Sequence, residues 1–147
     1  MKEYTLAEKL KFPIPYKWKI QSVKGNKAQC VAYIDARDVM DLLDRAIGIE
    51  NWKDSYHRDG ERLVCKLELK VNEEWVAKED VGTESQFESE KGEYSDAFKR
   101  AGVKWGIGRF LYDLEFKWID VDSAGKPVDK SGSRVYDITE YFKSLSK

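Results

Sequence analysis

Four basic residues lie between Ala97 and Tyr112, in a stretch of the sequence that has no acidic residue. They are Lys99, Arg100, Lys104 and Arg109. At 100° per residue, the first three fall on one side of a helix whose opposite side carries Phe98, Ala101, Trp105 and Tyr112. A helix with cations on one side can hold several phosphates of a nucleic-acid strand at once. These four residues are therefore candidate nucleic-acid ligands, although many such helix faces serve only solubility.

A second, weaker basic set lies in the first thirty residues, where seven lysines accompany two acids. Lys24 and Lys27 flank the Gly25-Asn26 turn of a predicted hairpin and complete the set of candidate DNA-binding residues. By contrast, residues 68–96 contain ten acids and three lysines. Separate basic and acidic surfaces suit a polyanionic ligand, or copies of the chain that pack basic face against acidic face.

Several carboxylates could support metal-dependent hydrolysis and define an alternative function, a nuclease. They are Glu68, Asp80, Glu88 and Glu90, with Lys91 beside the last of them. Glu88, Glu90 and Lys91 fall in a predicted loop, so the nuclease is the minor alternative. Cys30, Cys65 and His57 are too few for a zinc site, both cysteines are expected in the core, and no ATP-binding loop motif occurs. The sequence predicts no catalytic residue, no metal and no other cofactor.

The length and composition bound the remaining possibilities. A chain of 147 residues with 41% hydrophobic residues suffices for one domain over 1–147 with a core of its own. No long apolar run and no signal-peptide pattern occurs, which predicts a cytoplasmic protein without a membrane partner. The net charge of only −1 leaves nucleic-acid binding to depend on how the charges are distributed.

The elements that must position the basic residues follow from periodicity and turn chemistry. Helices are expected at 6–11, after the cap Asp35 as far as Gly48, from about Ser95 to Tyr112 with a bend or an early end at its glycines, and after Asp137. Strands are expected at 16–23, 28–34, 52–58, 63–71, 75–81 and 114–121, with loops at 83–93 and 122–132. This order predicts an α+β fold with an antiparallel β-β-β-α core, preceded by a β-hairpin and a helix.

Several short motifs in this order resemble the Rad52 superfamily of single-strand annealing proteins, in particular its phage and bacterial branch of Sak-like and DdrA-like proteins. The motifs are the runs 79–85, 90–92, 95–101 and 105–112, preceded by Tyr33-Ile34-Asp35, Gly48 and Asn51-Trp52. The resemblance covers roughly residues 20–114. It implies that copies of the core assemble side by side into a ring or a helical filament, with single-stranded DNA in a basic groove.

The resemblance also implies a function: ATP-independent annealing of complementary strands in homologous recombination and DNA double-strand break repair. Lys99 and Arg100 match the groove-lining basic pair of the family, whereas Lys104 and Arg109 are added from charge and spacing. Eukaryotic members carry further arginines where this chain has Val103 and Val23, with Lys104 and Lys24 adjacent as substitutes. The loop before the helix is shorter and far more acidic here than in those members, which places a second DNA site in doubt. An exonuclease or a single-strand-binding protein is a possible partner. A duplex RNA-binding module and a purely structural subunit remain alternatives.

Overall fold

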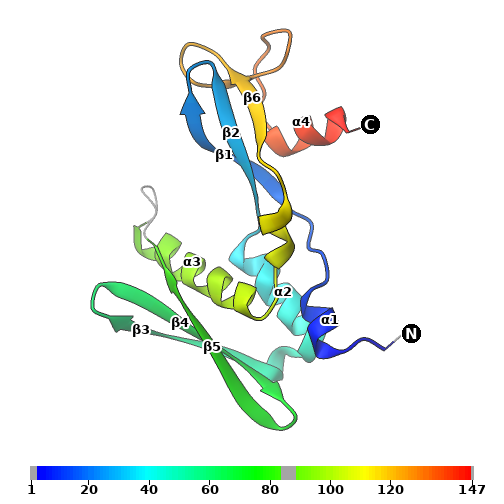
Figure 1. Cartoon of the computed structure of the whole chain (residues 1–147), viewed down its shortest axis with the longest axis vertical. Coiled ribbons are helices and arrows are strands. Elements are labelled where there is room, and N and C mark those ends of the chain that lie inside the picture. The colour runs from blue at the N-terminus through cyan, green and yellow to red at the C-terminus, as the bar shows by residue number, and fades with distance from the viewer. Residues whose placement is uncertain (1–2, 84–88, 147) are drawn as a thin grey trace. The chain divides into compact units, whose positions relative to one another are not determined.

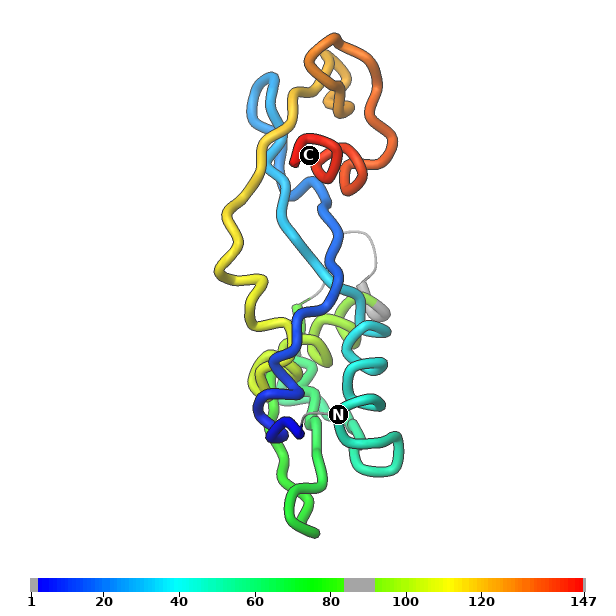
Figure 2. Tube along the Cα trace, turned by 90° about the vertical axis from the view of Figure 1, so that its right-hand side faces the viewer, coloured from blue at the N-terminus to red at the C-terminus, as the bar shows by residue number. Residues whose placement is uncertain are grey.

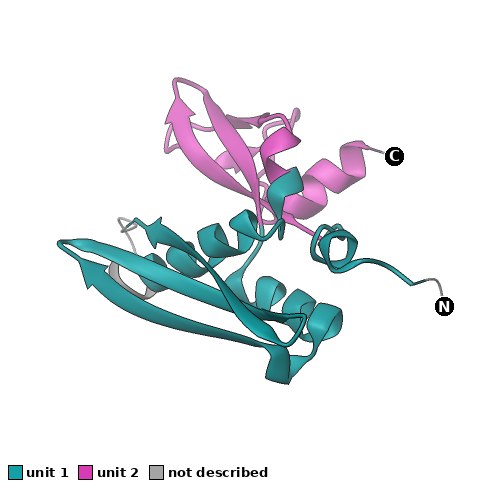
Figure 3. Ribbon diagram, turned by 60° about the horizontal axis from the view of Figure 1, so that its bottom comes forward, with its two compact units in different colours: residues 1–14, 34–110 teal, residues 15–33, 111–147 magenta. Residues whose placement is uncertain are grey.

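A computed structural model describes residues 3–83 and 89–146, with the side chains of 89–91 outside the description (Figure 1). The chain forms two compact units, and the Cα trace in Figure 2 passes between them three times. Unit 1 comprises Met1–Ile14 and Ile34–Phe110, and unit 2 comprises Pro15–Tyr33 and Leu111–Lys147 (Figure 3). One domain over 1–147 stays a prediction. Within the described ranges, no helix is long and apolar enough to cross a membrane.

The first two helices of unit 1 begin where the sequence predicts. In α1 (Leu6–Leu10), Thr5 accepts a hydrogen bond from the Glu8 backbone at 3.2 Å, and the Glu8 carboxylate accepts one from the Thr5 backbone at 2.9 Å. This reciprocal pair satisfies two amides that a helix start leaves open. In α2 (Ala36–Ile47), the Asp35 amide donates to Asp38, and Gly48 ends the helix with a φ of 91° that favours glycine. A short 3₁₀ turn, η1 (Ile49–Asn51), leads into the sheet.

Three antiparallel strands form the sheet of unit 1, as the sequence predicts. They are β3 (Trp52–Asp59), β4 (Arg62–Val71) and β5 (Glu74–Gly82), with β4 in the centre. Alternate residues of β4 are almost fully buried on one face: Leu63, Cys65, Leu67 and Leu69. That face packs against the next helix, whereas most of β5 is exposed. The alternation of apolar residues along β4 therefore correctly indicates which face of the strand is buried.

The helix that follows, α3 (Ser89–Lys104), begins six residues earlier than the sequence predicts. The predicted loop over 83–93 is wrong from Ser89 onward, and residues 84–88 lie outside the described part. The reason is tertiary packing: Glu93 is 4% exposed, and its carboxylate lies 3.0 Å from the Arg58 guanidinium. Gly82 allows the end of β5 to lie close to α3, because a Cβ there would lie 2.3 Å from the Glu93 carbonyl oxygen. A polar sequence thus becomes helical against the sheet.

The buried side of α3 contains Phe98 and Ala101 as predicted, and the helix ends early at its glycines, one of the two outcomes that the sequence predicts. It ends at Lys104, because Gly106 and Gly108 adopt φ angles of 102° and 74° that a helix does not allow. A 3₁₀ turn, η2 (Arg109–Asp113), follows. Tyr112, expected on the buried side, is 70% exposed.

Unit 2 contains a separate sheet of order β1-β2-β6-β7. Its strands are β1 (Lys17–Lys24), β2 (Lys27–Tyr33), β6 (Lys117–Val121) and the two-residue β7 (Pro127–Val128), which lies inside the predicted loop. The last helix, α4 (Ile138–Leu145), is capped by Asp137 and buries Phe142 against this sheet. Strand β6 begins three residues later than predicted.

The observed order confirms the α+β fold with antiparallel sheets. The β-β-β-α core is β3-β4-β5-α3 in unit 1, and the preceding hairpin is β1-β2 in unit 2. Cys30 and Cys65 are both fully buried, as the sequence predicts for small core residues.

Candidate nucleic-acid interface

Lys99 and Arg100 lie side by side on α3, and both make contacts within unit 1. The Lys99 ammonium donates to the Ile34 carbonyl oxygen at 3.2 Å, just before the start of α2. The Arg100 guanidinium lies 3.0 Å from the Asp96 carboxylate, one turn earlier on the same helix. Both cations are therefore held in place by neighbouring groups. A positioned cation loses less side-chain freedom when it binds a phosphate than a mobile one does.

Asp96 is a residue that the sequence reasoning missed. Its Oδ2 atom accepts hydrogen bonds from the Thr83 amide at 2.9 Å and hydroxyl at 3.2 Å, besides its contact with Arg100. Asp96 thus fixes the orientation of Arg100 and ties the end of β5 to α3. The spacing of an acid four residues before an arginine was the available signal, because these positions are neighbours on a helix surface.

Lys104 and Arg109 lie at the carboxyl end of α3. Arg109 turns back to this end, where its guanidinium donates to the Val103 carbonyl oxygen at 2.8 Å and to the Lys104 carbonyl oxygen at 3.1 Å. The last carbonyls of a helix lack the amide of the following turn as a partner and carry the negative end of the helix dipole. Here the Val103 carbonyl oxygen also accepts a hydrogen bond from the Gly106 amide at 2.9 Å. Arg109 is therefore a helix cap as well as an exposed cation. The Lys104 side chain is exposed at the same end of the helix.

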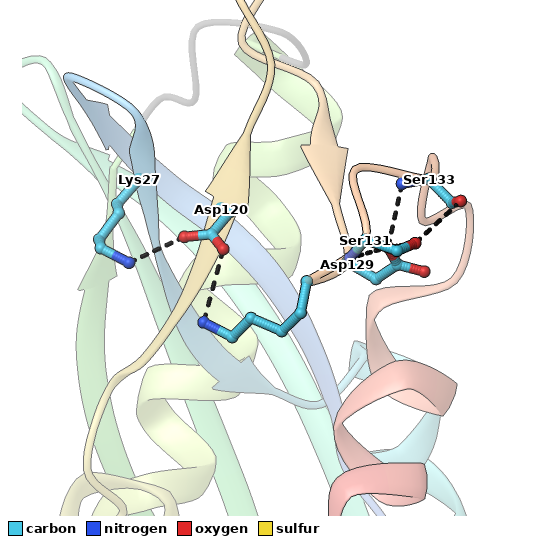
Figure 4. A network of polar contacts seen from close by, with 6 residues as sticks. Lys27, Asp120, Asp129, Ser131 and Ser133 are labelled. Atoms are coloured by element: carbon cyan, nitrogen blue, oxygen red, sulfur yellow. Dashed lines mark hydrogen bonds and ion pairs between the residues drawn. The ribbon is translucent and has the colours of Figure 1, made fainter.

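Lys24 and Lys27 belong to unit 2, where the register pairs them across the β1–β2 turn. The Lys27 ammonium lies 2.8 Å from the Asp120 carboxylate, which also contacts Lys130 at 3.5 Å (Figure 4). The Lys27 hydrogen bond is the main reason why the pKa of Asp120 lies below its usual value. Two lysines thus share one carboxylate, and the group as a whole is positive.

Figure 4 also shows the loop that follows β7. The Asp129 carboxylate accepts hydrogen bonds from the Ser131 hydroxyl at 2.6 Å and from the Ser133 amide at 3.0 Å. These bonds stabilise a turn of the kind that aspartate commonly forms with the residues after it. The turn shapes the loop around Lys130.

The carboxylates of the nuclease alternative do not form a site in the described part of the chain. Strand register places Glu68 opposite Ala77 and Asp80 opposite Cys65, so the two carboxylates point to opposite faces of the sheet. Glu88 and the side chains of Glu90 and Lys91 lie outside the described residues. Among the residues that are described, no group of three His, Cys, Asp or Glu side chains could hold a metal ion.

Most aromatic side chains near α3 serve packing. Trp105 donates from its indole nitrogen to the Leu67 carbonyl oxygen at 3.1 Å, and Phe98 packs against Trp52 with ring centroids 5.9 Å apart. Tyr56 and Tyr94 stack edge to face at 5.0 Å, joining β3 to α3. In unit 1, these contacts attach the helix that carries Lys99 and Arg100 to the sheet.

Comparison with known proteins connects this arrangement to a family. Residues 3–129 match the model of the Rad52/22 family of double-strand break repair proteins. The chain is 32% identical over 131 residues to the single-stranded DNA-binding protein DdrA of Deinococcus radiodurans, and 32% identical over 126 residues to DdrA of Deinococcus deserti. The alignments cover 84% and 81% of this chain and 62% of each relative, and both relatives are named for binding rather than for catalysis. The chain belongs to the Rad52/22 family of double-strand break repair proteins.

Proposed function

We propose that this protein binds single-stranded DNA and anneals complementary strands, without ATP and without covalent chemistry, during recombination and double-strand break repair in the cytoplasm. The observation that carries the proposal is the family match over residues 3–129, which includes all four basic residues at 99–109. The names of both DdrA relatives support single-stranded DNA as the ligand. The protein acts as a binding protein and not as an enzyme.

The contacts of the basic residues support phosphate binding. The pair of Arg100 and Asp96 is partly exposed, and exposed ion pairs contribute only about 0–1 kcal/mol. Exchanging the carboxylate for a phosphate therefore costs little. A phosphate offers the same planar guanidinium a bidentate acceptor, which is a strong hydrogen-bonding arrangement. Lys99 adds a fixed positive charge one residue away.

The proposal includes assembly into a homo-oligomer. One copy contributes few phosphate contacts, and its net charge is −1. Several copies along one strand raise the effective concentration of binding sites and convert weak contacts into useful affinity. An exonuclease or a single-strand-binding protein would supply or hand over the single strands that such an oligomer anneals.

A strand-annealing assay tests this function. Two complementary oligonucleotides, one with a fluorophore and one with a quencher, should pair faster with the protein than alone, with no nucleotide present. K99Q/R100Q removes two charges while it keeps hydrogen-bonding side chains, and it should slow the reaction. For binding to oligo-dT, the slope of log affinity against log salt should become shallower by about 1.4 per subunit contacted, since each lost phosphate contact changes it by about 0.7.

The matched control is K143Q, which removes one charge from an exposed lysine of α4. It should leave annealing unchanged. Thermal unfolding of all three proteins shows whether the variants remain folded. No acceleration by the native protein would contradict the proposed function, whereas equal loss in K143Q would contradict the placement of the site on α3. Stronger competition by duplex RNA than by oligo-dT would favour the RNA-binding alternative.

A further inference from the structure

Trp118 lies on the face of the unit 2 sheet that points away from the apolar core of that unit. In the strand register, Trp118 is opposite Gln29, and Gln29 is opposite Ser22. The next pair in the register is Ala28 of β2 and Ile119 of β6, which are 0% and 3% exposed and belong to the core. Because successive residues of a strand point to opposite faces, Trp118 faces away from that core. It is 48% exposed.

Cations flank Trp118 on the same face, here called the Trp118 face. The register places on it Lys17, Lys19, Ser22 and Lys24 of β1, Lys27, Gln29, Val31 and Tyr33 of β2, Asp120 of β6 and Val128 of β7. The Lys19 ammonium lies 4.8 Å from the centre of the Tyr33 ring. Asp120 is the one acid that these register pairs bring to the face, and it is in contact with both Lys27 and Lys130. The face is therefore strongly positive around an exposed indole.

We propose that Trp118 is a stacking platform for a base of single-stranded DNA, with the lysines of the Trp118 face holding the phosphates on either side. This inference rests on the proposed function and adds a base contact to it. Proteins that bind single strands without sequence preference combine a cationic track with aromatic side chains on which bases stack. Every base has a π-face, so this contact suits annealing of strands of any sequence.

The charge of the face identifies its occupant. A positive surface with one neutralised acid is complementary to a polyanion, and an exposed indole is complementary to a polyanion whose bases are unpaired. Duplex DNA keeps its bases stacked inside and would leave the ring without a partner. A second copy of this chain could instead cover the ring, and the experiment separates that case.

The test uses the 147-residue chain with the shortest oligo-dT that it binds, and with an abasic oligonucleotide of the same length. W118A should weaken binding to oligo-dT by roughly 5- to 150-fold, the range that loss of one stacked base gives. W118F should recover most of this loss. The salt slope should not change in W118A, because no phosphate contact is removed. Binding to the abasic oligomer should be the same for the native protein and W118A.

Y136A is the matched control, because Tyr136 is an aromatic residue of the same unit that is 87% exposed and lies outside the strands. It should bind oligo-dT like the native protein. If the native protein binds oligo-dT and W118A binds it equally well, the platform is refuted while the proposed function stands. If W118A changes the oligomer mass without DNA, the ring is covered by a second copy and the inference is overturned. If the native protein binds no oligo-dT, the proposed function itself fails.

Discussion

Replacing Gly82 with Ala tests how α3 is held on its sheet. The new Cβ would lie 2.3 Å from the Glu93 carbonyl oxygen, 2.8 Å from the Ala97 amide nitrogen and 2.9 Å from the Ala97 Cβ. Two of these three atoms are backbone, so no side chain can rotate away. The end of β5 and α3 must separate by about 1 Å to restore ordinary van der Waals contact. This movement opens the contact between the sheet and Phe98, which is 1% exposed.

The expected cost follows from this geometry. Overpacking against a well-packed site costs typically 1–3 kcal/mol, and a rigid backbone obstacle places G82A near ~3 kcal/mol. For a chain of this size, a loss of that magnitude lowers the melting temperature by roughly 10 °C. Affinity for oligo-dT should also fall, because the movement of α3 changes the positions of Lys99 and Arg100. Differential scanning calorimetry and fluorescence anisotropy measure the two effects.

G102A is the matched control, because it makes the same substitution at a glycine of α3. A Cβ at Gly102 would meet the Val39 Cγ1 atom at 3.3 Å, and this side-chain methyl can adjust. Alanine also favours a helix over glycine by up to about 1 kcal/mol. G102A should therefore remain within about 1 kcal/mol of the native protein. A melting temperature of G82A equal to that of G102A would refute the close backbone contact.

Three further predictions concern charged and reactive side chains. R58M leaves the buried Glu93 carboxylate without its cation and should lower the free energy of unfolding by ~1–3 kcal/mol, so an unchanged urea midpoint would contradict the pair. The contact of Lys27 with Asp120 holds the pKa of that carboxyl below its usual value of about 3.9. The contact therefore stabilises the fold fully above the usual pKa, and this stabilisation is lost as the pH falls through the lowered pKa. In K27M, an NMR titration should show the pKa of Asp120 raised towards its usual value, and an unaltered pKa would count against this pairing. Burial raises the pKa of the Cys65 thiol to about 12, so a thiol reagent at pH 8 should react with it only after unfolding, and rapid reaction in the native state would show that the core opens.

Much of the local structure could be predicted because its causes lie within a few residues. The Thr5 and Glu8 spacing fixes the start of α1, and Gly48 fixes the end of α2. Alternating apolar residues predicted β4 and its buried face correctly. The glycines after Lys104 end α3 before the residues that follow it. In each case, the conformation that the neighbouring residues favour is also the one that the tertiary structure requires.

The remaining features depend on contacts between residues far apart in the sequence. Helix α3 begins early because Glu93 pairs with Arg58, which lies 35 positions earlier. The hairpin β1–β2 joins β6 rather than the three-stranded sheet, and strand order is not encoded in alternation alone. Charge and spacing predicted the candidate cations, but they did not predict most of the contacts that hold these side chains in place. The role of Arg109 as a helix cap became visible only in the folded chain, whereas the pairing of Asp96 with Arg100 had a sequence signal in their spacing of four residues.

The most direct test of the central claim measures particle mass and bound oligo-dT in the same sample at low and high salt. We predict an oligomer of the 17.1 kDa chain that carries oligo-dT at low salt and releases it as salt rises, without ATP in the buffer. K99Q/R100Q should bind less DNA at every salt concentration. A 17.1 kDa particle that binds no oligo-dT even at low salt would contradict the account.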